Sequence, residues 1–454
     1  MGCERDISDD AVLATFPRTA EVFIDAPIGM GSNFYFPYAD SKATAWSVDE
    51  DESYQGLTSM RIDVPNENDP AGSYAGAILR IDGSGRDLTG FDALTFWARA
   101  SQGVTIGEFG LGEDFNDNTY LTTITNVSLG TAWQKVIIPL PDPSVLTEES
   151  GMFRYAAGTN GTGGSAYTIW VDELQFEKLG TIAQPRPAIQ NGEDIVTQNF
   201  IGGIFSVTGL TQTLNTTTGD VTTVIASSFF EFSSSNENVA TVNQDGQVSV
   251  IGSGTAVITA TLGDEEAQGS LTVESLGDFI PAPVPTRDSE NVISIFSDAY
   301  NNVPVDYYNG FFNGDGQTTQ GGTGPNGADI SVDGDGIINY TDLNFVGIGT
   351  FMNVPPINAT SMSHLHVDIN VNEEMTSGDF IRLQLINNVG GNETSGSVTL
   401  TNNELTTNEW EGFDIPLSQF SGLSDRSQIG LLFFISDSSI SDIYVDNIYF
   451  YSED

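Results

Sequence analysis

Short runs of alternating apolar and polar residues recur along the whole chain, and no long stretch repeats at helical spacing. The clearest run, FEFSSSNENVATVNQDGQVSVIGSGTAVITATL at 230–262, contains turn signals at Asp245-Gly246 and at Gly252-Ser253-Gly254. Alternation with a period of two, broken by Gly-rich turns, is typical of strands that bury one face. The pattern therefore predicts an all-β protein with very little helix.

Length and proline placement predict the domain organisation. A chain of 454 residues suggests about three domains, each able to bury its own core. Two proline-rich stretches, AQPRPA at 183–188 and FIPAPVPTR at 279–287, favour extended backbone and indicate stiff linkers. The predicted parts are a flexible tail and three tandem β-sandwiches: 1–16, 17–182, 190–276 and 288–454.

The first and third blocks repeat three strand sequences in the same order. The pairs are LTFWA with LHVDI, WQKVIIPL with WEGFDIPL, and IWVDELQF with IYVDNIYF. Asp172 and Asp446 hold the same place in the last pair. The repetition predicts two related sandwiches, one on each side of the middle block.

Acidic residues strongly outnumber basic ones, with 62 Asp and Glu against 14 Lys and Arg and a net charge of −48. Between residues 289 and 454 the only basic side chains besides histidine are Arg382 and Arg426. A field of this sign repels nucleic acid, anionic lipid and acidic polysaccharides. A neutral ligand is therefore favoured, although the same charge would also keep the protein soluble.

Cys3 is the only cysteine, so the chain has no internal disulfide. It stands between Met-Gly and the acidic stretch ERDISDD, as in a processed bacterial lipoprotein whose signal peptide has been replaced. No apolar run approaches the roughly 18–20 residues that a membrane span needs. We expect lipidation of Cys3 and exposure at the outer membrane surface, with an incidental terminal cysteine as the alternative.

The middle block resembles the group 2 bacterial immunoglobulin-like domain. The motifs SSN, VA, DG and ITA follow that family's pattern over almost the whole block. The resemblance implies a small sandwich that serves mainly as a spacer in surface proteins. The block contains no His, Cys, Trp, Lys or Arg, so we assign it no chemistry.

The outer blocks resemble carbohydrate-binding sandwiches. DLTGFDALTFWARAS at 87–101 and TAWQKVIIPLPDPSVLTEESGMFRYAAG at 131–158 resemble modules of surface glycan-binding lipoproteins from Bacteroidota polysaccharide-utilisation systems. VISIFSDAY at 292–300, MSHLHVDINV at 362–371 and EWEGFDIPLSQFSGL at 409–423 are similar to the C-terminal modules of laminarinases and of SusE-like binding proteins. Both resemblances imply jelly-roll sandwiches.

Together these resemblances imply a non-catalytic, monomeric surface protein that captures a neutral polysaccharide. Laminarin, a β-1,3-glucan, is the expected ligand, because the third block is most similar to modules attached to laminarinases. A SusC/SusD-type uptake complex is the expected partner. Nucleic acid is not expected to bind.

Aromatic residues that leave the core are the expected sugar contacts, because pyranose rings present C–H faces beside hydroxyl groups. In LTFWARA, alternation places Phe96 on one face and Trp97 on the other. The third block's first long loop carries five rings, which either form a sugar platform or fold back on themselves. The expected glycan-binding residues are Trp46, Trp97, Tyr120, Tyr155, Tyr300, Tyr307, Tyr308, Phe311, Phe312, His366 and Asp368, with Tyr35, Tyr38 and Tyr54 as comparable candidates.

Two departures from the relatives concern tryptophan. Related modules commonly carry one in the long loop of the third block and another at the position of Asn370, and this chain has neither. Either Tyr and Phe replace the missing indoles, or this copy binds differently. Trp133 and Trp410 begin matching strands in the two blocks, which favours a structural role.

Calcium is the expected cofactor, in a structural role that the resemblance implies. Its ligands would be Asp172 in the first block, and Asp298 with Asp446 in the third, since carboxylate oxygens suit this ion. SVDGDGIINYTD at 331–342 looks like a dockerin calcium loop. Its first ligand position is Ser331, however, so a turn rich in Asp and Gly is the favoured interpretation.

Two other functional classes stay open at this point. A glycoside hydrolase needs only two carboxylates, but no ExDxxE strand motif occurs, and no nucleophile set or phosphate loop can be built. We therefore expect no catalytic residue. An adhesive or structural surface protein would use similar aromatic loops.

Overall fold

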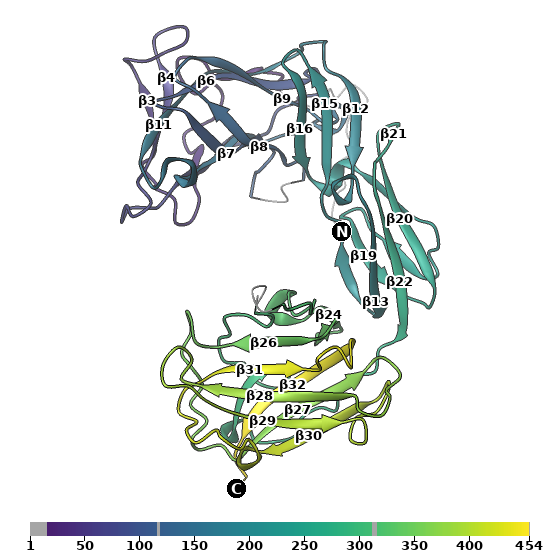
Figure 1. Ribbon diagram of the computed structural model, residues 1–454. Coiled ribbons are helices and arrows are strands. Elements are labelled where there is room, and N and C mark those ends of the chain that lie inside the picture. The colour runs from purple at the N-terminus through teal and green to yellow at the C-terminus, as the bar shows by residue number, and fades with distance from the viewer. Residues whose placement is uncertain (1–15, 116–118, 311–315, 454) are drawn as a thin grey trace, which may run out of the picture. The chain divides into compact units, whose positions relative to one another are not determined.

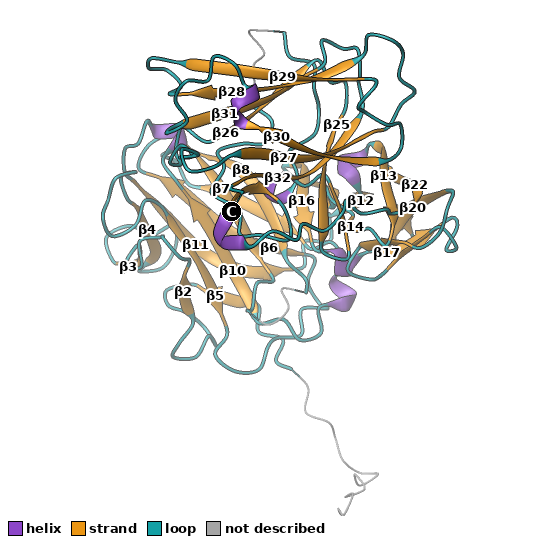
Figure 2. Cartoon of the chain, turned by 90° about the horizontal axis from the view of Figure 1, so that it is seen from below, coloured by secondary structure: helices purple, strands orange, loops and turns teal. Residues whose placement is uncertain are grey.

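A computed structural model describes residues 16–115, 119–310 and 316–453 (Figure 1). Cys3, Phe311 and Phe312 lie outside these residues, so their roles stay predictions. Strands make up nearly all regular structure, and helical residues form only short turns (Figure 2), which confirms the all-β prediction. None of the helices in these ranges has the length and apolar character to cross a membrane. The 3-10 turns are Pro143–Val145, Asn160–Thr162, Gln190–Gly192, Ser227–Phe229, Ser289–Asn291, Pro325–Gly327 and Leu417–Gln419.

The chain divides into two compact units. The first comprises Met1–Thr197, Phe205–Val248 and Thr255–Val273. The second comprises Gln198–Ile204, Ser249–Gly254 and Glu274–Asp454.

One sheet of the first unit has the strand order β3-β4-β11-β6-β9, with β1 beside β11. The alternation in β6 is as predicted, since Phe96 is fully buried and Trp97 lies on the outer face with Arg99. The rings of Phe96, Phe109 and Phe153 meet in the core at centroid distances of 5.2 to 5.8 Å. The strands are β1 Glu21–Phe23, β3 Trp46–Asp49, β4 Ser59–Val64, β6 Ala93–Ala100, β9 Gln134–Pro139 and β11 Tyr167–Glu177.

The opposite sheet of the first unit has eight strands in the order β12-β15-β16-β8-β7-β10-β5-β2. The first proline-rich stretch is strand β12 rather than a linker. It lies at the sheet edge, where a proline without an N–H group is tolerated. The strands are β2 Tyr35–Pro37, β5 Ala75–Arg80, β7 Val104–Leu111, β8 Thr122–Leu129, β10 Gly151–Ala157, β12 Ala183–Ala188, β15 Thr211–Thr216 and β16 Gly219–Ile225.

The remaining strands of the middle block form two small sheets. Their orders are β13-β22-β20-β17, with β21 beside β20, and β14-β19-β18. The strands are β13 Asp194–Ile201, β14 Ile204–Ser206, β17 Glu231–Ser234, β18 Ala240–Val242, β19 Gln247–Val250, β20 Thr255–Leu262, β21 Glu265–Glu266 and β22 Ser270–Asp278.

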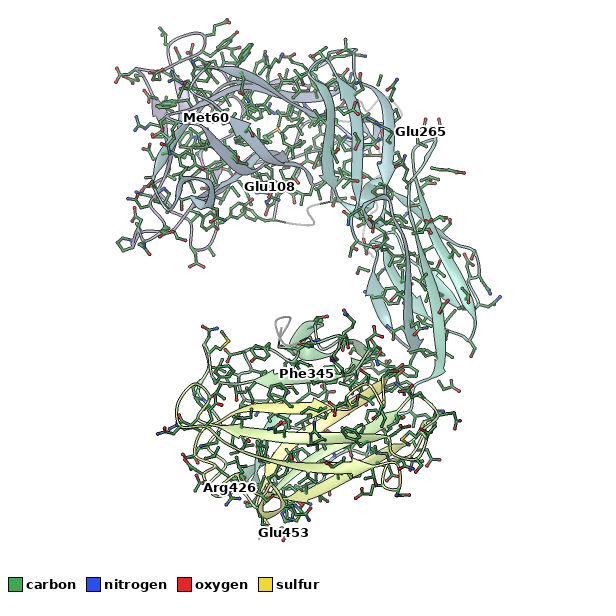
Figure 3. The ribbon with its side chains drawn as sticks, in the orientation of Figure 1. Met60, Glu108, Glu265, Phe345, Arg426 and Glu453 are labelled. Atoms are coloured by element: carbon green, nitrogen blue, oxygen red, sulfur yellow. The ribbon has the colours of Figure 1, made fainter. Side chains whose placement is uncertain are left out.

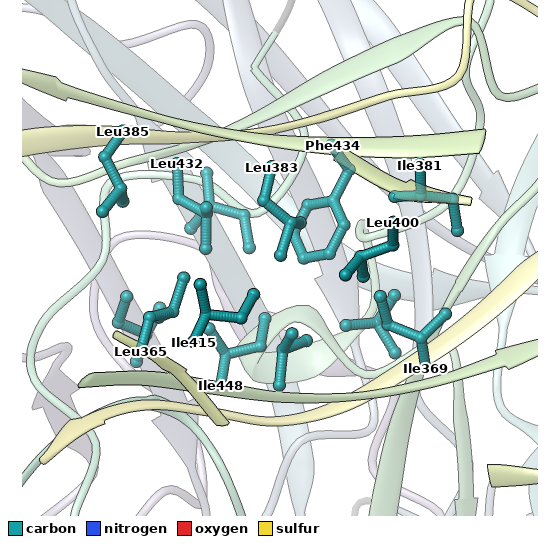
Figure 4. Close-up of a cluster of buried hydrophobic side chains, with 14 of the residues drawn as sticks. Leu365, Ile369, Ile381, Leu383, Leu385, Leu400, Ile415, Leu432, Phe434 and Ile448 are labelled. Carbon is teal, nitrogen blue, oxygen red and sulfur yellow. The ribbon is translucent and has the colours of Figure 1, made fainter. Parts of the chain in front are cut away.

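The second unit contains a sandwich of two sheets with a core of aliphatic side chains. Figure 4 shows Leu365, Ile369 and Ile415 of one sheet facing Leu383 and Leu432 of the other. The orders are β24-β25-β32-β27-β30, with β23 beside β32, and β26-β31-β28-β29. The strands are β23 Val292–Phe296, β24 Ile330–Val332, β25 Asp335–Tyr340, β26 Phe345–Gly349, β27 His364–Val371, β28 Phe380–Asn387, β29 Thr394–Thr401, β30 Trp410–Pro416, β31 Ile429–Ile435 and β32 Ile443–Tyr451.

The repeated strand sequences occupy equivalent places in the two units. The order β4-β11-β6-β9 in one sheet matches β25-β32-β27-β30 in the other, and β1 and β23 flank β11 and β32 in the same way. Asp172 pairs with Trp97, and Asp446 pairs with Asp368. Each aspartate is followed by a residue with left-handed backbone, at φ 51° for Glu173 and 49° for Asn447. The two sandwiches thus share one strand arrangement and one local turn.

Candidate functional site

The outer face of β5, β7 and β10 in the first unit combines small residues with tyrosine rings. The strand register places Gly76 beside Ala156. A Cβ atom at Gly76 would lie 2.8 Å from both Tyr38 Cδ2 and Tyr74 Cε2, so the two rings stand directly over this strip. A cavity of about 500 Å³ lies against Tyr74 and Ala156. We call this strip of small residues, with the cavity and the Tyr38 and Tyr74 rings beside it, the groove.

A charged cluster lies on the same sheet face, two residues from Ala156 along β10. Arg154 Nη2 is 3.2 Å from Glu108 Oε1, and its Nη1 is 3.1 Å from Glu113 Oε2. Figure 3 labels Glu108 on the first unit. The Tyr38 hydroxyl donates to Glu113 at 2.5 Å, and the Arg154 guanidinium carbon lies 5.6 Å from the Tyr38 ring centroid. These contacts hold the Arg154 guanidinium, the two carboxylates and the Tyr38 hydroxyl in fixed orientations.

Burial shifts the pKa of two groups in this cluster, Glu108 and Tyr38. It raises the pKa of Glu108, an effect that the Arg154 charge opposes. Burial, followed by the hydrogen bond to Glu113, raises the pKa of Tyr38 above its ordinary value. The phenol thus keeps its proton at neutral pH. The cluster offers a sugar both acceptor oxygens and guanidinium and hydroxyl donors.

More rings lie on the same sheet face. Phe36 pairs with Ile78 on β5, and its ring meets Phe115 edge to face at 4.9 Å. Phe115 is 54% exposed, and the Arg80 guanidinium carbon lies 6.0 Å from its ring centroid. Exposed rings beside partly buried charged groups are what stacking on a pyranose and binding its hydroxyls require.

Trp97 lies on the other sheet, and its ring is already stacked. Tyr54 covers it at a centroid distance of 3.9 Å and an interplanar angle of 12°, and Trp133 meets Tyr54 edge to face at 5.9 Å. Tyr54 itself is 39% exposed. Of the predicted rings on this face, Tyr54 rather than Trp97 is the accessible one.

We expect Trp97→Ala to lower the free energy of unfolding by about 2 kcal/mol, because it removes a stacked, half-buried ring. Glycan retention in affinity electrophoresis should stay near wild type. Phe115→Ala is the contrasting variant, with weaker retention and little change in melting temperature. Lost retention in Trp97→Ala alone would instead place the ligand on the Tyr54 and Trp97 face.

Three other rings expected to bind sugar in the first block pack within the unit. Tyr155 is fully buried, and its hydroxyl lies 3.3 Å from that of Tyr35, so its predicted ligand contact is wrong. Alternation places Tyr155 in the core because Arg154 takes the outer face. Trp46 stacks on Tyr35 at 5.6 Å. Tyr120 packs against Phe229 at 5.1 Å.

The described rings of the third block's long loop fold back onto the sandwich, which was the alternative interpretation. Tyr308 donates to the Ile295 carbonyl at 3.0 Å and packs against Phe296. Tyr307 lies against Gly349, where a Cβ atom would meet its ring at 2.3 Å. Tyr300 donates to the carbonyl of Arg287. These contacts leave Tyr300, Tyr307 and Tyr308 partly buried.

Part of the second proline-rich stretch packs on the second unit. Residues 281–287, here called the strap, lie against the outer face of β27 and β32. Asn447 Nδ2 donates to the Pro283 carbonyl at 3.3 Å, and the Arg287 guanidinium carbon lies 3.4 Å from the Tyr451 ring centroid. Ala282 is 5% exposed. The strap is therefore a docked segment and not a free linker.

His366 and Asp368 lie beneath the strap. Asp368 is 2% exposed and accepts a hydrogen bond from Asn447 at 2.8 Å, so its carboxylate is held within the unit and its contact with glycan stays a prediction. His366 stacks on Tyr449 at 4.6 Å and lies 2.9 Å from Asp414. Burial lowers the pKa of His366, but Asp368 and Asp414 outweigh it and the net shift is upward.

Asp172 holds a loop with both of its carboxylate oxygens. One accepts the backbone N–H groups of Tyr54 and Gln55, at 2.8 and 3.1 Å, and the other accepts that of Glu173. Asp25 accepts the N–H groups of Leu57 and Thr58 in the same way. Both oxygens of Asp172 therefore anchor this loop, and the role of Asp172 as a calcium ligand stays a prediction.

The carboxylates of the second unit fit a cation better. Asp298, Asp335 and Asp446 line one cavity of about 290 Å³. Burial, and then the neighbouring carboxylates, raise the pKa of Asp446 to about 8 and that of Asp335 to about 6. Within the described ranges, however, no three acidic, His or Cys side chains already stand at metal-ligand geometry. Asp333 and Gly334 form the two-residue turn between β24 and β25, as the favoured interpretation of SVDGDG predicts.

Sequence reasoning did not select Tyr74, Arg154, Glu108 or Glu113. A signal for Arg154 existed in MFRYAA, where two aromatic residues flank an arginine in a strand. Alternation puts both flanking rings in the core and the arginine on the outer face. The two glutamates carried no comparable signal, because 62 acidic residues offer too many candidates.

Two family models match parts of the chain. Residues 21–178 match the model for carbohydrate binding domain 30, a non-catalytic type. This part of the chain is similar to carbohydrate-binding modules, which supports glycan binding. Residues 226–264 match the model for the intimin immunoglobulin-like domain, which confirms an immunoglobulin-like segment in the middle block. The chain has no significant match among curated protein sequences.

Similar solved structures are also carbohydrate-binding modules. A family 30 module has 18% identity and a TM-score of 0.27, covering 35% of this chain and 97% of the module. A family 30 module of a Clostridium thermocellum cellulosomal cellulase has 19% identity and a TM-score of 0.23, covering 36% and 95%. A family 11 module from that organism, in complex with a β-1,3-1,4-mixed-linked tetrasaccharide, has 17% identity and a TM-score of 0.24, covering 36% and 96%.

Proposed function

We propose that the protein captures a neutral polysaccharide in the groove of the first unit, without cleaving it. The observation that carries this proposal is the combination, on one sheet face, of the Tyr38 and Tyr74 rings with the charged cluster around Arg154. The match of residues 21–178 to a carbohydrate-binding domain supports it. The net charge of −48 supports an uncharged ligand.

The finer parts of the proposal rest on the sequence. Laminarin is the proposed polysaccharide because the third block resembles modules attached to laminarinases. Cys3 in its acidic tail supports a lipid anchor and a position at the outer membrane surface. Hand-over to a SusC/SusD-type uptake complex would follow from that position. We also propose calcium at Asp298 and Asp446, with Asp335 as a further ligand, in the second unit.

Arg154→Ala tests the groove. It removes the central donor and leaves Glu108 and Glu113 without their cationic partner, so affinity for the retained glycan should fall at least about tenfold. Affinity electrophoresis of the full chain in gels with laminarin, mixed-linkage glucan, xylan or mannan measures this. Released reducing sugar would contradict the non-catalytic assignment.

Arg99→Ala is the matched control, because Arg99 is also an outer-face arginine paired with a glutamate, but on the opposite sheet. It should leave retention unchanged. Equal retention by the Arg154→Ala and wild-type chains on every polysaccharide would reject the groove as the binding site.

A further inference from the structure

The second unit contains a cavity of about 340 Å³ at one end of the sheet formed by β25, β27, β30 and β32. Trp410 and Tyr444 form much of its apolar wall, with ring centroids 6.4 Å apart. Phe200 meets Tyr444 edge to face at 5.7 Å. The Trp410 indole N–H donates to the Ile280 carbonyl at 2.8 Å, which fixes the ring in place.

The polar wall of the same cavity is built from amide side chains. Asn339 and Asn372 both donate to Asp442 Oδ1, at 2.9 and 3.0 Å. Asn370 is different, because the residue is only 8% exposed and its buried Oδ1 accepts no hydrogen bond from any residue that the structure describes. An unpartnered acceptor therefore lies in the wall of an otherwise satisfied polar network.

The strand register places this acceptor between the two rings. Asn370 on β27 pairs with Trp410 on β30 and with Tyr444 on β32. Leaving a buried amide oxygen without a donor destabilises the folded chain, and an aliphatic side chain at this position would avoid that loss. A ligand that donates a hydrogen bond would satisfy the oxygen.

We propose that this cavity is a second carbohydrate site, which takes one or two neutral pyranose residues. Asn370 Oδ1 accepts a sugar hydroxyl, and the Trp410 and Tyr444 rings lie against the C–H faces of the sugar. A volume of about 340 Å³ is at the lower end of the range for ligand sites, which limits the occupant to a short segment or a chain end. Asp442 and Asp278 in the lining disfavour an anionic ligand.

This inference extends the proposed function but uses none of the residues of the groove. Two sites on one chain raise the avidity for a polymer when both reach it. The test must therefore separate the two sites. Four full-length chains serve for this: wild type, Arg154→Ala, Asn370→Leu and the double variant.

Titration calorimetry with laminaritriose, and separately with cellotriose, measures the affinity that each chain retains. We expect Asn370→Leu to reduce the affinity left in the Arg154→Ala chain at least tenfold. The melting temperature of Asn370→Leu should equal or exceed that of wild type, because the unpartnered oxygen is gone. Asn403→Leu, an exposed asparagine outside the cavity, is the matched control and should change neither quantity.

The outcomes separate the two assignments. Equal affinity of the double variant and Arg154→Ala would overturn the cavity as a sugar site. A lower melting temperature in Asn370→Leu would also overturn it, since the amide would then be structural. If Asn370→Leu abolishes binding while Arg154→Ala changes nothing, the groove assignment fails and the cavity stands.

Discussion

Arg86→Met is expected to lower the free energy of unfolding of the first unit by about 3–5 kcal/mol. Arg86 is 1% exposed, and its guanidinium donates to three backbone carbonyls. Its Nη1 reaches the oxygens of Thr19 and Glu21 at 3.1 and 2.8 Å, and Nη2 reaches that of Ile28 at 2.5 Å. Hydrogen bonds from a charged group contribute about 1.5–3 kcal/mol each, and Met replaces none of them.

The loss of Arg86 should also loosen the loop that contains Leu57 and Thr58. Arg86 fixes the chain on both sides of β1, and Asp25 just beyond that strand anchors Leu57 and Thr58. Denaturant unfolding of the full chain measures the loss. Arg86→Lys should recover only part of it, because an ammonium group cannot reach three carbonyls in a fork geometry.

Arg18→Met provides the matched control for this prediction. Arg18 lies in the N-terminal segment that Arg86 contacts, but its side chain is 67% exposed, and its contact is an ion pair with Asp87. Exposed ion pairs contribute about 0–1 kcal/mol, so this variant should unfold almost as wild type does. Similar losses in the two arginine variants would show that the buried carbonyl contacts are not what stabilises the segment.

Strand alternation predicted the architecture well because it reports directly on burial. The repeat of three strand sequences has a structural counterpart in the equivalent places of β6 and β27, β9 and β30, and β11 and β32. The first proline-rich stretch was misread because a strand at a sheet edge can contain proline. Pattern alone does not say which strand becomes an edge. The strap was misread because its contacts are with residues far away in sequence.

The site was harder to predict because side-chain type does not say which surface a ring contacts. Tyr155 and Tyr38 are both tyrosines near strands, yet one is in the core and the other borders the groove. Trp97 was placed correctly on an outer face, but nothing in the sequence says that Tyr54 covers it. That contact depends on Asp172, which holds the loop through backbone amides from a distant strand. Long-range partners of this kind become visible only in three dimensions.

The calcium proposal predicts an unusual pH dependence for the second unit. Without metal, burial first and then Asp335, Asp298 and Asp368 raise the pKa of Asp446 to about 8, against 3.8 for a free side chain. The folded state thus binds more protons than the unfolded state between these two values. Stability should fall as pH rises through this window, by up to about 1.4 kcal/mol per pH unit, and should level off above pH 8.

A cation in this cavity would favour the charged carboxylates and should remove the slope. The measurement is thermal unfolding of the full chain in EDTA and in calcium chloride, at pH values from 5 to 9. Asp446→Asn should be more stable than wild type in EDTA at high pH, with a weaker pH slope and little response to calcium. Asp437→Asn, an exposed aspartate whose side chain is 66% accessible, should behave as wild type does. If calcium stabilised the Asp446→Asn and wild-type chains equally, the ion would bind elsewhere, and the raised pKa of Asp446 would reflect burial without a metal role.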